Sequence, residues 1–221
     1  MNVCENGHKS HQSVQTRTIQ GAFRVWNWEL YRGQRGYCTG MDDVSQTLLR
    51  LGVWEKDETE AIARRLKPGD VFLDFGAHIG WFTVLAATHG AEVHAYEGDA
   101  ENLDLLRTNA RLHGVQDRVT AHLVWVDADA YCDIPAGPIR LVKIDLEGND
   151  DQAIRCLMPA LQEGRVEELV VEVSPCFNDR YPALVAKMCE LGYEVYRGNG
   201  ERWNRMWDFH QDNFWFRRDR G

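Results

Sequence analysis

The feature that most restricts the fold is a short apolar run that ends in an acid and two glycines. Residues 71–74 read as a buried strand, because the run is continuously apolar up to its final acid. Gly76 and Gly80 then permit a tight turn, and the apolar residues from Trp81 onward predict a helix. The free N–H groups at the start of such a helix point at whatever occupies the turn. Residues 69–80 therefore predict a strand, a turn and a helix with a ligand site at the turn.

A second strand, predicted over residues 92–96, ends at Glu97, which lies 21 residues after Gly76. A carboxylate at the tip of the second strand can accept hydrogen bonds from both hydroxyls of a ribose. Together the turn and Glu97 predict a site for a cofactor that contains a nucleoside. An ordinary strand-to-helix turn is the alternative, since glycines are common in such turns.

The spacing of the glycines indicates which cofactor is expected. The turn lacks the third glycine of the G-x-G-x-x-G pattern that makes room for a pyrophosphate, so hydride cofactors are disfavoured. Asp74, Gly76, His78 and Gly80 instead follow the acid-x-Gly-x-Gly-x-Gly turn of methyltransferases that use S-adenosylmethionine, with His78 in place of the middle glycine. Histidine tolerates a positive φ better than most residues, so this replacement is physically plausible.

The remainder of the chain alternates strand-like and helix-like segments. This alternation predicts an α/β fold, a Rossmann-like doubly wound sheet of seven strands with helices on both faces. We expect the last two strands to form an antiparallel edge. The predicted strands cover residues 71–74, 92–96, 119–126, 140–145, 168–173, 194–196 and 213–216.

The N-terminal part gives weaker signals. Residues 1–20 are expected to be loosely ordered, and residues 23–37 are aromatic and basic without a clear period. Two helices are expected between residues 41 and 66, the first with an apolar stripe of Val44, Leu48, Leu49 and Leu51. We therefore divide the chain into an extension with a small helical cap, residues 1–66, which contributes to an acceptor site, and a catalytic domain, residues 67–221.

The bulk properties limit the partners and the compartment. A net charge of −9 with scattered basic residues argues against nucleic-acid binding and favours a small-molecule or carbohydrate acceptor. Six cysteines without a C-x-x-C pair suggest a reducing compartment and no zinc site. No apolar run reaches membrane-spanning length, and the start of the chain has no apolar signal-peptide segment, so a cytoplasmic, soluble protein without a membrane partner is expected.

A second constellation follows the strand at residues 140–145. Because the carboxyl ends of strands in an open α/β sheet meet at one crevice, Asp145 and Glu147 should face the same space as Gly76 and Glu97. Asp150 and Asp151 have a structural explanation as acids in the first turn of a helix, and Lys143 is expected to be an internal ion-pair partner.

These segments resemble the FkbM-type methyltransferases. The likeness covers roughly residues 41–217 and is carried by Lys67–Gly80, by Ala95-Tyr-Glu97 with Asn102, Leu106 and Asn109 after it, and above all by Val142-Lys-Ile-Asp-Leu-Glu-Gly148. Members of that family are class I enzymes that use S-adenosylmethionine, and most methylate hydroxyls of sugars, polyketides and other secondary metabolites. Where His78 and Asn149 stand, the family more often has Asn and an acidic residue.

The resemblance implies roles for individual residues. The turn would hold the methionine end of the cofactor, Glu97 its ribose, and Asp145 with Glu147 the methyl-transfer side. In class I enzymes an acid after the third strand often contacts the adenine amino group, which favours Asp127, with Asp129 as a close rival. The predicted cofactor-binding residues are Asp74, Gly76, Ala77, His78, Gly80, Glu97, Asn102 and Asp127.

Transfer of a methyl group to a hydroxyl also requires a base within hydrogen-bond reach. The candidates are Asp145, Glu147, His78 and His210, of which we favour the two carboxylates and keep His210 as a third catalytic candidate. A divalent metal held by Asp145, Glu147 and Asp127 is a less favoured variant.

Eight tryptophans raise a further question. Trp26 and Trp28 with Tyr31 and Tyr37, and Trp203 with Trp207, can line a lid over the acceptor; the alternative is core packing or a homo-oligomer contact. For the whole chain, the alternatives to an O-methyltransferase are a nicotinamide-dependent oxidoreductase and a non-catalytic scaffold that keeps the methyltransferase fold.

Overall fold

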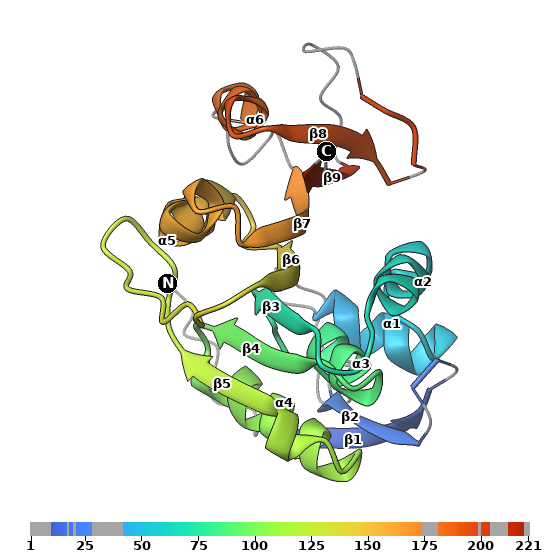
Figure 1. Ribbon diagram of the computed structural model, residues 1–221. Helices are drawn as coiled ribbons and strands as arrows, with labels where there is room; N and C mark the ends of the chain where they lie inside the picture. The colour runs from blue at the N-terminus through green and yellow to red at the C-terminus, as the bar shows by residue number, and fades with distance from the viewer. Residues whose placement is uncertain are drawn as a thin grey trace, which may run out of the picture.

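A computed structural model describes residues 10–16, 18–19, 21–27, 42–173, 181–198, 200–203 and 212–218 of the chain. Its main feature is a mostly parallel seven-stranded sheet with helices on both faces (Figure 1). The strands are β3 (Val71–Phe75), β4 (Glu92–Glu97), β5 (Val119–Leu123), β6 (Ile139–Ile144), β7 (Val166–Val173), β8 (Tyr193–Arg197) and β9 (Asp212–Arg218). The helices are α1 (Asp43–Leu51), α2 (Lys56–Arg65), α3 (Trp81–Thr88), α4 (Ala100–Leu112), α5 (Asp150–Gln162) and α6 (Tyr181–Glu190), with a 3-10 turn, η2 (Gln116–Arg118). The predicted fold class is confirmed.

The order of the strands determines where a ligand can bind. The sheet runs β5-β4-β3-β6-β7-β9-β8, with parallel pairs from β5 to β7. The chain moves outward from β3 to β5 and then returns to place β6 on the other side of β3. A crevice opens at the carboxyl ends of the strands where the winding reverses, which here is between β3 and β6. The expected antiparallel edge is also confirmed, because β9 pairs antiparallel with both β7 and β8.

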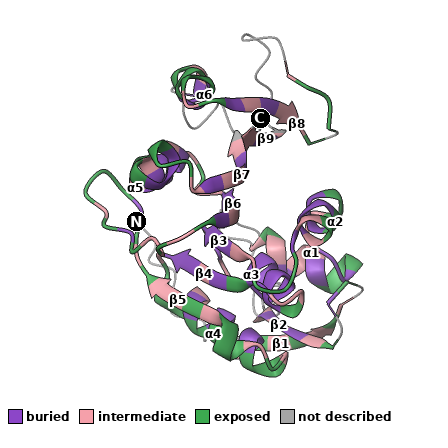
Figure 2. Ribbon diagram, viewed as in Figure 1, coloured by how far each residue is buried: buried purple, intermediate pink, exposed green. Residues whose placement is uncertain are grey.

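The two faces of the sheet form two apolar clusters because successive side chains of a strand point to opposite sides. Val142 and Ile144 of β6 pack with Leu157 of α5, whereas Leu141 packs in the cluster that contains residues of α2 and α3. Accordingly, α5 and α6 lie on one side of the sheet and α1, α2 and α3 on the other (Figure 1). The central strands are buried and the outward sides of the helices are exposed (Figure 2).

The N-terminal part contains a hairpin that the sequence analysis missed. Strands β1 (Ser10–Gln15) and β2 (Ala22–Asn27) pair antiparallel, so the expectation of loose order is wrong for residues 10–15. Phe23 and Val25 are 0% exposed and join the core cluster of α2 and α3, which stabilises the hairpin by burial. The Asn109 amide holds it to α4 by accepting from Arg24 N at 2.7 Å and donating to Arg24 O at 3.0 Å.

The two expected N-terminal helices are present as α1 and α2. Leu48 is buried, but Leu49 and Leu51 are 41% and 42% exposed, so the apolar stripe of α1 is narrower than predicted. Leu48 and Ile62 lie in the same cluster as Phe72 of β3, so this segment packs directly on the large sheet. Within the described part of the chain, every helix is too short or too polar to cross a membrane.

Candidate functional site

A cavity of about 560 Å³ lies at the crevice predicted by the strand order. Its walls come from the ends of β3, β4, β6 and β7, from the segment after β5, and from the residues around the starts of α1 and α2. Among the residues predicted from the sequence, the structure brings together Gly76, Ala77, His78, Glu97, Asp145 and Glu147 around this cavity.

The glycine turn is held in one conformation by the strands beside it. Gly76 has a φ of 82°, and a Cβ added there would lie 1.9 Å from the carbonyl oxygen of Asp145, so no larger residue can occupy this position without moving the backbone. His78 has a φ of 50°, as expected from its place in the motif. Gly76 N and Ala77 N donate to Tyr96 O at 2.9 and 3.2 Å, which ties the turn to β4.

Glu97 lies at the end of β4 directly beside this turn. Its Oε2 accepts a hydrogen bond from His78 N at 2.7 Å, and its Oε1 accepts one from Asp99 N at 2.8 Å. The side chain is therefore fixed, and the residue is 9% exposed. Since a carboxylate oxygen can accept more than one hydrogen bond, both oxygens retain capacity for a ligand.

An aromatic surface lies next to Glu97. Trp125 is 68% exposed and lines the cavity, and a Cβ on Gly98 would lie 2.5 Å from its Cε3 atom. Gly98 thus lets the indole lie against the backbone after β4. The predicted strand over residues 119–126 ends at Leu123, so Val124, Trp125 and Val126 leave the sheet and form this wall.

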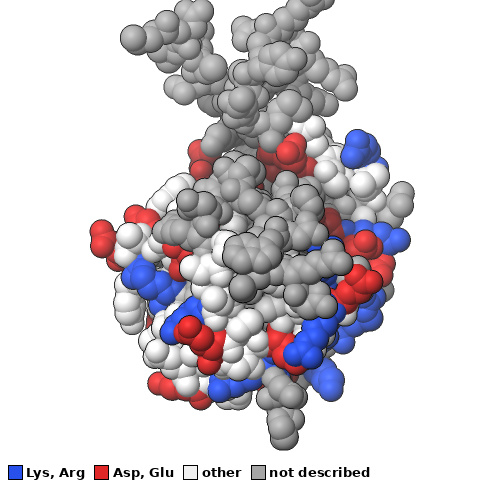
Figure 3. All heavy atoms as spheres, turned by 90° about the horizontal axis from the view of Figure 1, so that it is seen from above, with Lys and Arg blue, Asp and Glu red and all other residues white. Residues whose placement is uncertain are grey.

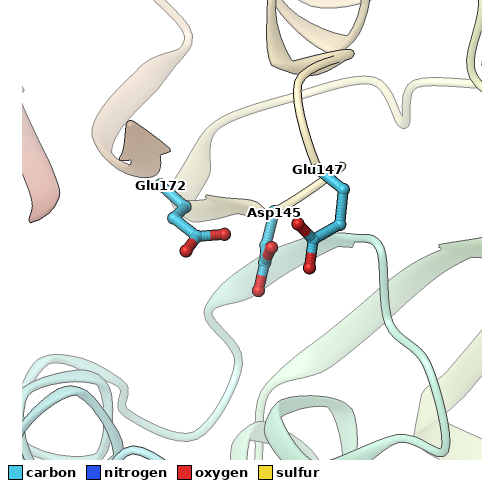
Figure 4. Close-up of side chains that lie close together, drawn as sticks. All are labelled: Asp145, Glu147 and Glu172. Atoms are coloured by element: carbon cyan, nitrogen blue, oxygen red, sulfur yellow. The ribbon is translucent and has the colours of Figure 1, made fainter. Parts of the chain in front are cut away.

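Strand β7 and the segment directly after β6 contribute a group of three carboxylates to the cavity. Asp145, Glu147 and Glu172 each place an oxygen within 4.8 Å of the others, and Figure 4 shows the side chains turned toward the same space. Lys143 Nζ lies 2.8 Å from Asp145 Oδ2 and 3.7 Å from Glu58 Oε1, which confirms the expected ion-pair role of this lysine.

The surroundings of the two candidate carboxylates, Asp145 and Glu147, shift their pKa values in opposite directions. Burial opposes ionisation of Asp145, but the charge of Lys143 and the hydrogen bonds with Glu172 and Lys143 lower its pKa overall. Burial and the charge of Asp145 raise the pKa of Glu147, which is exposed and has a φ of 49°. Glu147 is therefore the better proton acceptor of the two near neutral pH.

Carboxylates grouped in this way can also bind a divalent cation. The predicted metal set named Asp127, whereas the described residues place Glu172 beside Asp145 and Glu147, so that part of the prediction is wrong. The reason is topological, since β7 pairs directly with β6 whereas Asp127 lies beyond the end of β5. Asp127 is exposed, and its Oδ1 accepts from Asp129 N at 3.0 Å.

Besides Asp127, three predicted cofactor residues lie outside the lining of the cavity. Asp74 is 1% exposed, its Oδ2 accepts from the Thr83 hydroxyl at 2.6 Å, and burial raises its pKa to about 6. Asp74 therefore stabilises the turn from within the core, through its hydrogen bond to α3. Gly80 begins α3, and a Cβ there would lie 2.7 Å from Leu106 Cγ.

The third is Asn102, whose Oδ1 accepts from Trp26 Nε1 at 2.9 Å. Trp26 thereby joins the hairpin to α4, and Trp203 packs edge-on against Phe214 with ring centroids 5.3 Å apart. For Trp26 and Trp203, these contacts agree with packing inside the protein rather than with a lid over the acceptor. Catalytic candidate His210 and the aromatic residues Trp28, Tyr31, Tyr37 and Trp207 lie outside the described residues.

Sequence reasoning missed several residues of the site. Glu172 had a detectable signal, since it is an acid near the carboxyl end of β7, directly after the apolar run Leu169–Val171. Asp42 and Glu55 also line the cavity, but they precede α1 and α2, and no spacing relates them to the sheet.

The surface has mixed charge on the side seen from above. On this face of the molecule, the Lys and Arg side chains that the structure describes lie next to Asp and Glu side chains (Figure 3). Arg107 with Asp104 and Arg118 with Glu92 are exposed ion pairs elsewhere on the molecule.

Comparison with known proteins identifies the fold. No family model matches the chain. Among solved structures, it is similar to a TehB-like SAM-dependent methyltransferase from Corynebacterium glutamicum, with 13% identity, 79% of this chain and 94% of that chain covered, and a TM-score of 0.55. It is similar to precorrin-6y C5,15-methyltransferase from Geobacter metallireducens, with 16% identity, 76% and 90% coverage, and a TM-score of 0.54. It is also similar to a SAM-dependent O-methyltransferase from Thermotoga maritima, with 20% identity, 75% and 66% coverage, and a TM-score of 0.51. The chain therefore has the Rossmann-like fold found in methyltransferases that use S-adenosylmethionine.

Proposed function

We propose that this protein is an S-adenosylmethionine-dependent O-methyltransferase of the FkbM type that acts on a hydroxyl of a small-molecule or sugar-like acceptor. The observation that carries the proposal is the contact of Glu97 with the glycine turn, in the same cavity as Asp145 and Glu147. The fold is consistent with this activity but does not identify it, because one fold hosts many functions.

The residues around the cavity have the chemistry that the cofactor requires. Glu97 has two fixed oxygens for the two ribose hydroxyls, and the exposed indole of Trp125 offers a flat surface for an adenine ring. Gly76, where a Cβ would collide with the Asp145 backbone, keeps the turn narrow beside the start of α3. A helix start with free N–H groups favours a carboxylate such as that of the methionine end.

S-adenosylmethionine supplies a methyl group on a sulfonium, whose thioether leaves without needing a proton. The protein has to hold the acceptor hydroxyl at near-attack distance and remove its proton. We assign proton removal to Glu147, because its pKa is raised and its side chain is exposed at the cavity. Asp145 is bound to Lys143 and serves to position the acceptor or the cofactor amine.

The acceptor side includes the N-terminal extension. Asp42, Val44, Trp54 and Glu55 all line the cavity and all belong to residues 1–66. This supports the proposed division, in which that segment contributes to acceptor binding and residues 67–221 bind the cofactor.

Calorimetry tests the cofactor assignment directly. Titration of the purified protein with S-adenosylhomocysteine should give saturable heat, and NAD should not displace it. Absence of heat, or displacement by NAD at similar concentration, would refute the proposal. The variant Glu60→Gln, which changes an exposed acid of α2 outside the cavity, is the matched control for variants of Glu97.

The base is tested by Glu147→Gln. We expect this variant to bind S-adenosylhomocysteine like the wild type and to lose turnover by about 10²–10⁴-fold, the usual contribution of a general base. Turnover is followed as transfer of a deuterated methyl group from the cofactor to metabolites of a cell extract. Unchanged turnover with intact cofactor binding would eliminate Glu147 as the base.

A further inference from the structure

We infer that the acceptor carries a cationic nitrogen group, an ammonium or guanidinium, in addition to the hydroxyl that receives the methyl group. The inference rests on the proposed function and specifies the substrate class of the same cavity. It comes from the charge of the lining and from buried carboxylate oxygens that receive no hydrogen bond from the residues that the structure describes.

The lining is strongly acidic. Among the described residues of the lining, Lys143 is the single lysine, and its amine is already engaged by Asp145 and by Glu58. The carboxylates that line the cavity are Asp42, Asp43, Glu55, Glu97, Asp145, Glu147 and Glu172.

Asp42 points to a ligand independently of this charge count. Its side chain is only 7% exposed, it lines the cavity, and neither carboxylate oxygen accepts a hydrogen bond in the part of the chain that the structure describes. His78 Nε2 lies 3.5 Å from Oδ1 without forming one. Oε2 of Glu55 is likewise buried and receives no hydrogen bond. Buried acceptors in folded proteins are nearly always satisfied, so a donor supplied by a bound molecule is expected here.

The cofactor contacts proposed above leave these oxygens without a donor. S-adenosylmethionine carries a sulfonium, an ammonium and a carboxylate, so it contributes one net positive charge to a cavity with an excess of carboxylates. Its contacts are assigned to Glu97, to the glycine turn and to Asp145, which belong to β3, β4 and β6. Asp42 and Glu55 instead immediately precede α1 and α2, on the wall formed by the N-terminal extension.

Charge complementarity then selects the acceptor. A phosphorylated or carboxylated molecule would be repelled by Asp42 and Glu55, and a neutral sugar would satisfy hydrogen bonds but leave the charge uncompensated. An ammonium or guanidinium offers several charged N–H donors, which form the strongest hydrogen bonds with carboxylates. The structure thus assigns Asp42 and Glu55 as the subsite for the cationic group.

The decisive experiment identifies the charge of the methylated product. The protein is incubated with deuterated-methyl cofactor and a cell extract of its source organism, and labelled metabolites are separated by ion exchange at neutral pH. The label should be retained on the cation exchanger. A labelled product that is unretained, or retained only on the anion exchanger, would overturn the inference but leave the proposed function intact. Absence of any labelled small molecule would overturn the proposed function itself.

A variant pair then locates the subsite with the purified labelled metabolite as acceptor. Asp42→Asn should raise the acceptor KM about tenfold or more, because a charged hydrogen bond is replaced by a neutral one. Its affinity for S-adenosylhomocysteine should stay unchanged, which also reports that the variant is folded. Asp57→Asn, an exposed acid of α2 outside the cavity, is the control and should change neither value.

Equal KM values for both variants would overturn the subsite assignment. Activity that EDTA abolishes and Mg²⁺ restores, with a neutral acceptor, would instead assign the carboxylates to a metal ion and overturn the inference.

Discussion

Replacing Gly76 by alanine tests whether the turn conformation creates the cofactor site. Two effects add at this position. An L-residue at a φ of 82° is strained by about 1–2 kcal/mol. The new Cβ would also lie 1.9 Å from Asp145 O, a backbone atom at the end of β6, and relief of such overpacking costs about 1–3 kcal/mol.

The collision cannot be relieved by a side-chain rotation, because Asp145 N donates to Phe75 O at 3.0 Å and so couples β6 to the strand that carries the turn. Either the turn or the end of β6 has to move. We therefore expect a loss of about 2–5 kcal/mol in the free energy of unfolding. The Kd for S-adenosylhomocysteine should rise about tenfold or more, which corresponds to about 1.4 kcal/mol or more.

Gly69→Ala is the matched control. Gly69 has a φ of 87°, but an added Cβ there meets no atom within 4 Å, so only the strain of about 1–2 kcal/mol applies. Urea unfolding followed by circular dichroism gives the stability of both variants, and calorimetry gives their Kd. If both variants lose the same stability and bind the ligand equally well, the close approach of Gly76 to β6 has no role in the site.

Three further changes test the electrostatics. Lys143→Met leaves the half-buried Asp145 without its buried lysine partner and should lower the free energy of unfolding by about 3–5 kcal/mol in urea titrations, whereas a loss below about 1 kcal/mol would contradict a stabilising ion pair. Glu97→Gln removes a charged acceptor and should raise the Kd for S-adenosylhomocysteine about 10–100-fold by calorimetry; an unchanged Kd would exclude a ribose contact. Burial raises the folded-state pKa of Asp74 to about 6 from an ordinary value of 3.8, so its contribution to stability is present below the ordinary pKa and is lost as the pH rises through about 6. The variant Asp74→Asn can still accept from Thr83 but cannot ionise. Between about pH 4 and about pH 7, the free energy of unfolding of the wild type should therefore fall by up to about 3 kcal/mol more than that of the variant. Identical pH profiles would contradict this assignment.

Local patterns were sufficient for most of the sheet. Strands β3, β4 and β6 were predicted to within one residue at each end, because each is a short, mostly apolar run that is followed by glycine or an acid. The positive φ of His78 also followed from its position in the motif. The hairpin was missed although Phe23 and Val25 alternate with more polar residues, because a single short alternation is a weak signal without its partner strand.

The functional side chains also divide into those that the sequence placed correctly and those that it did not. Glu97, Asp145 and Glu147 follow strands at positions that any doubly wound sheet brings to one edge, so the sequence predicted that they share a cavity. The sequence favours Asp127 for the adenine contact because the third strand is expected to run to Val126. The chain leaves the sheet at Leu123 instead, and Trp125 takes the place beside the cavity.

Local sequence was enough to predict the strands of the large sheet, the helices that flank it and the carboxylates at the strand tips, because these depend on neighbours a few residues away. Tertiary packing was needed to place Asp42 and Glu55 on the same wall and to bring Lys143 of β6 to Glu58 of α2. Those relations connect residues that are far apart in the chain. They exist because packing of α1, α2 and the hairpin on the sheet removes water and brings distant charges together.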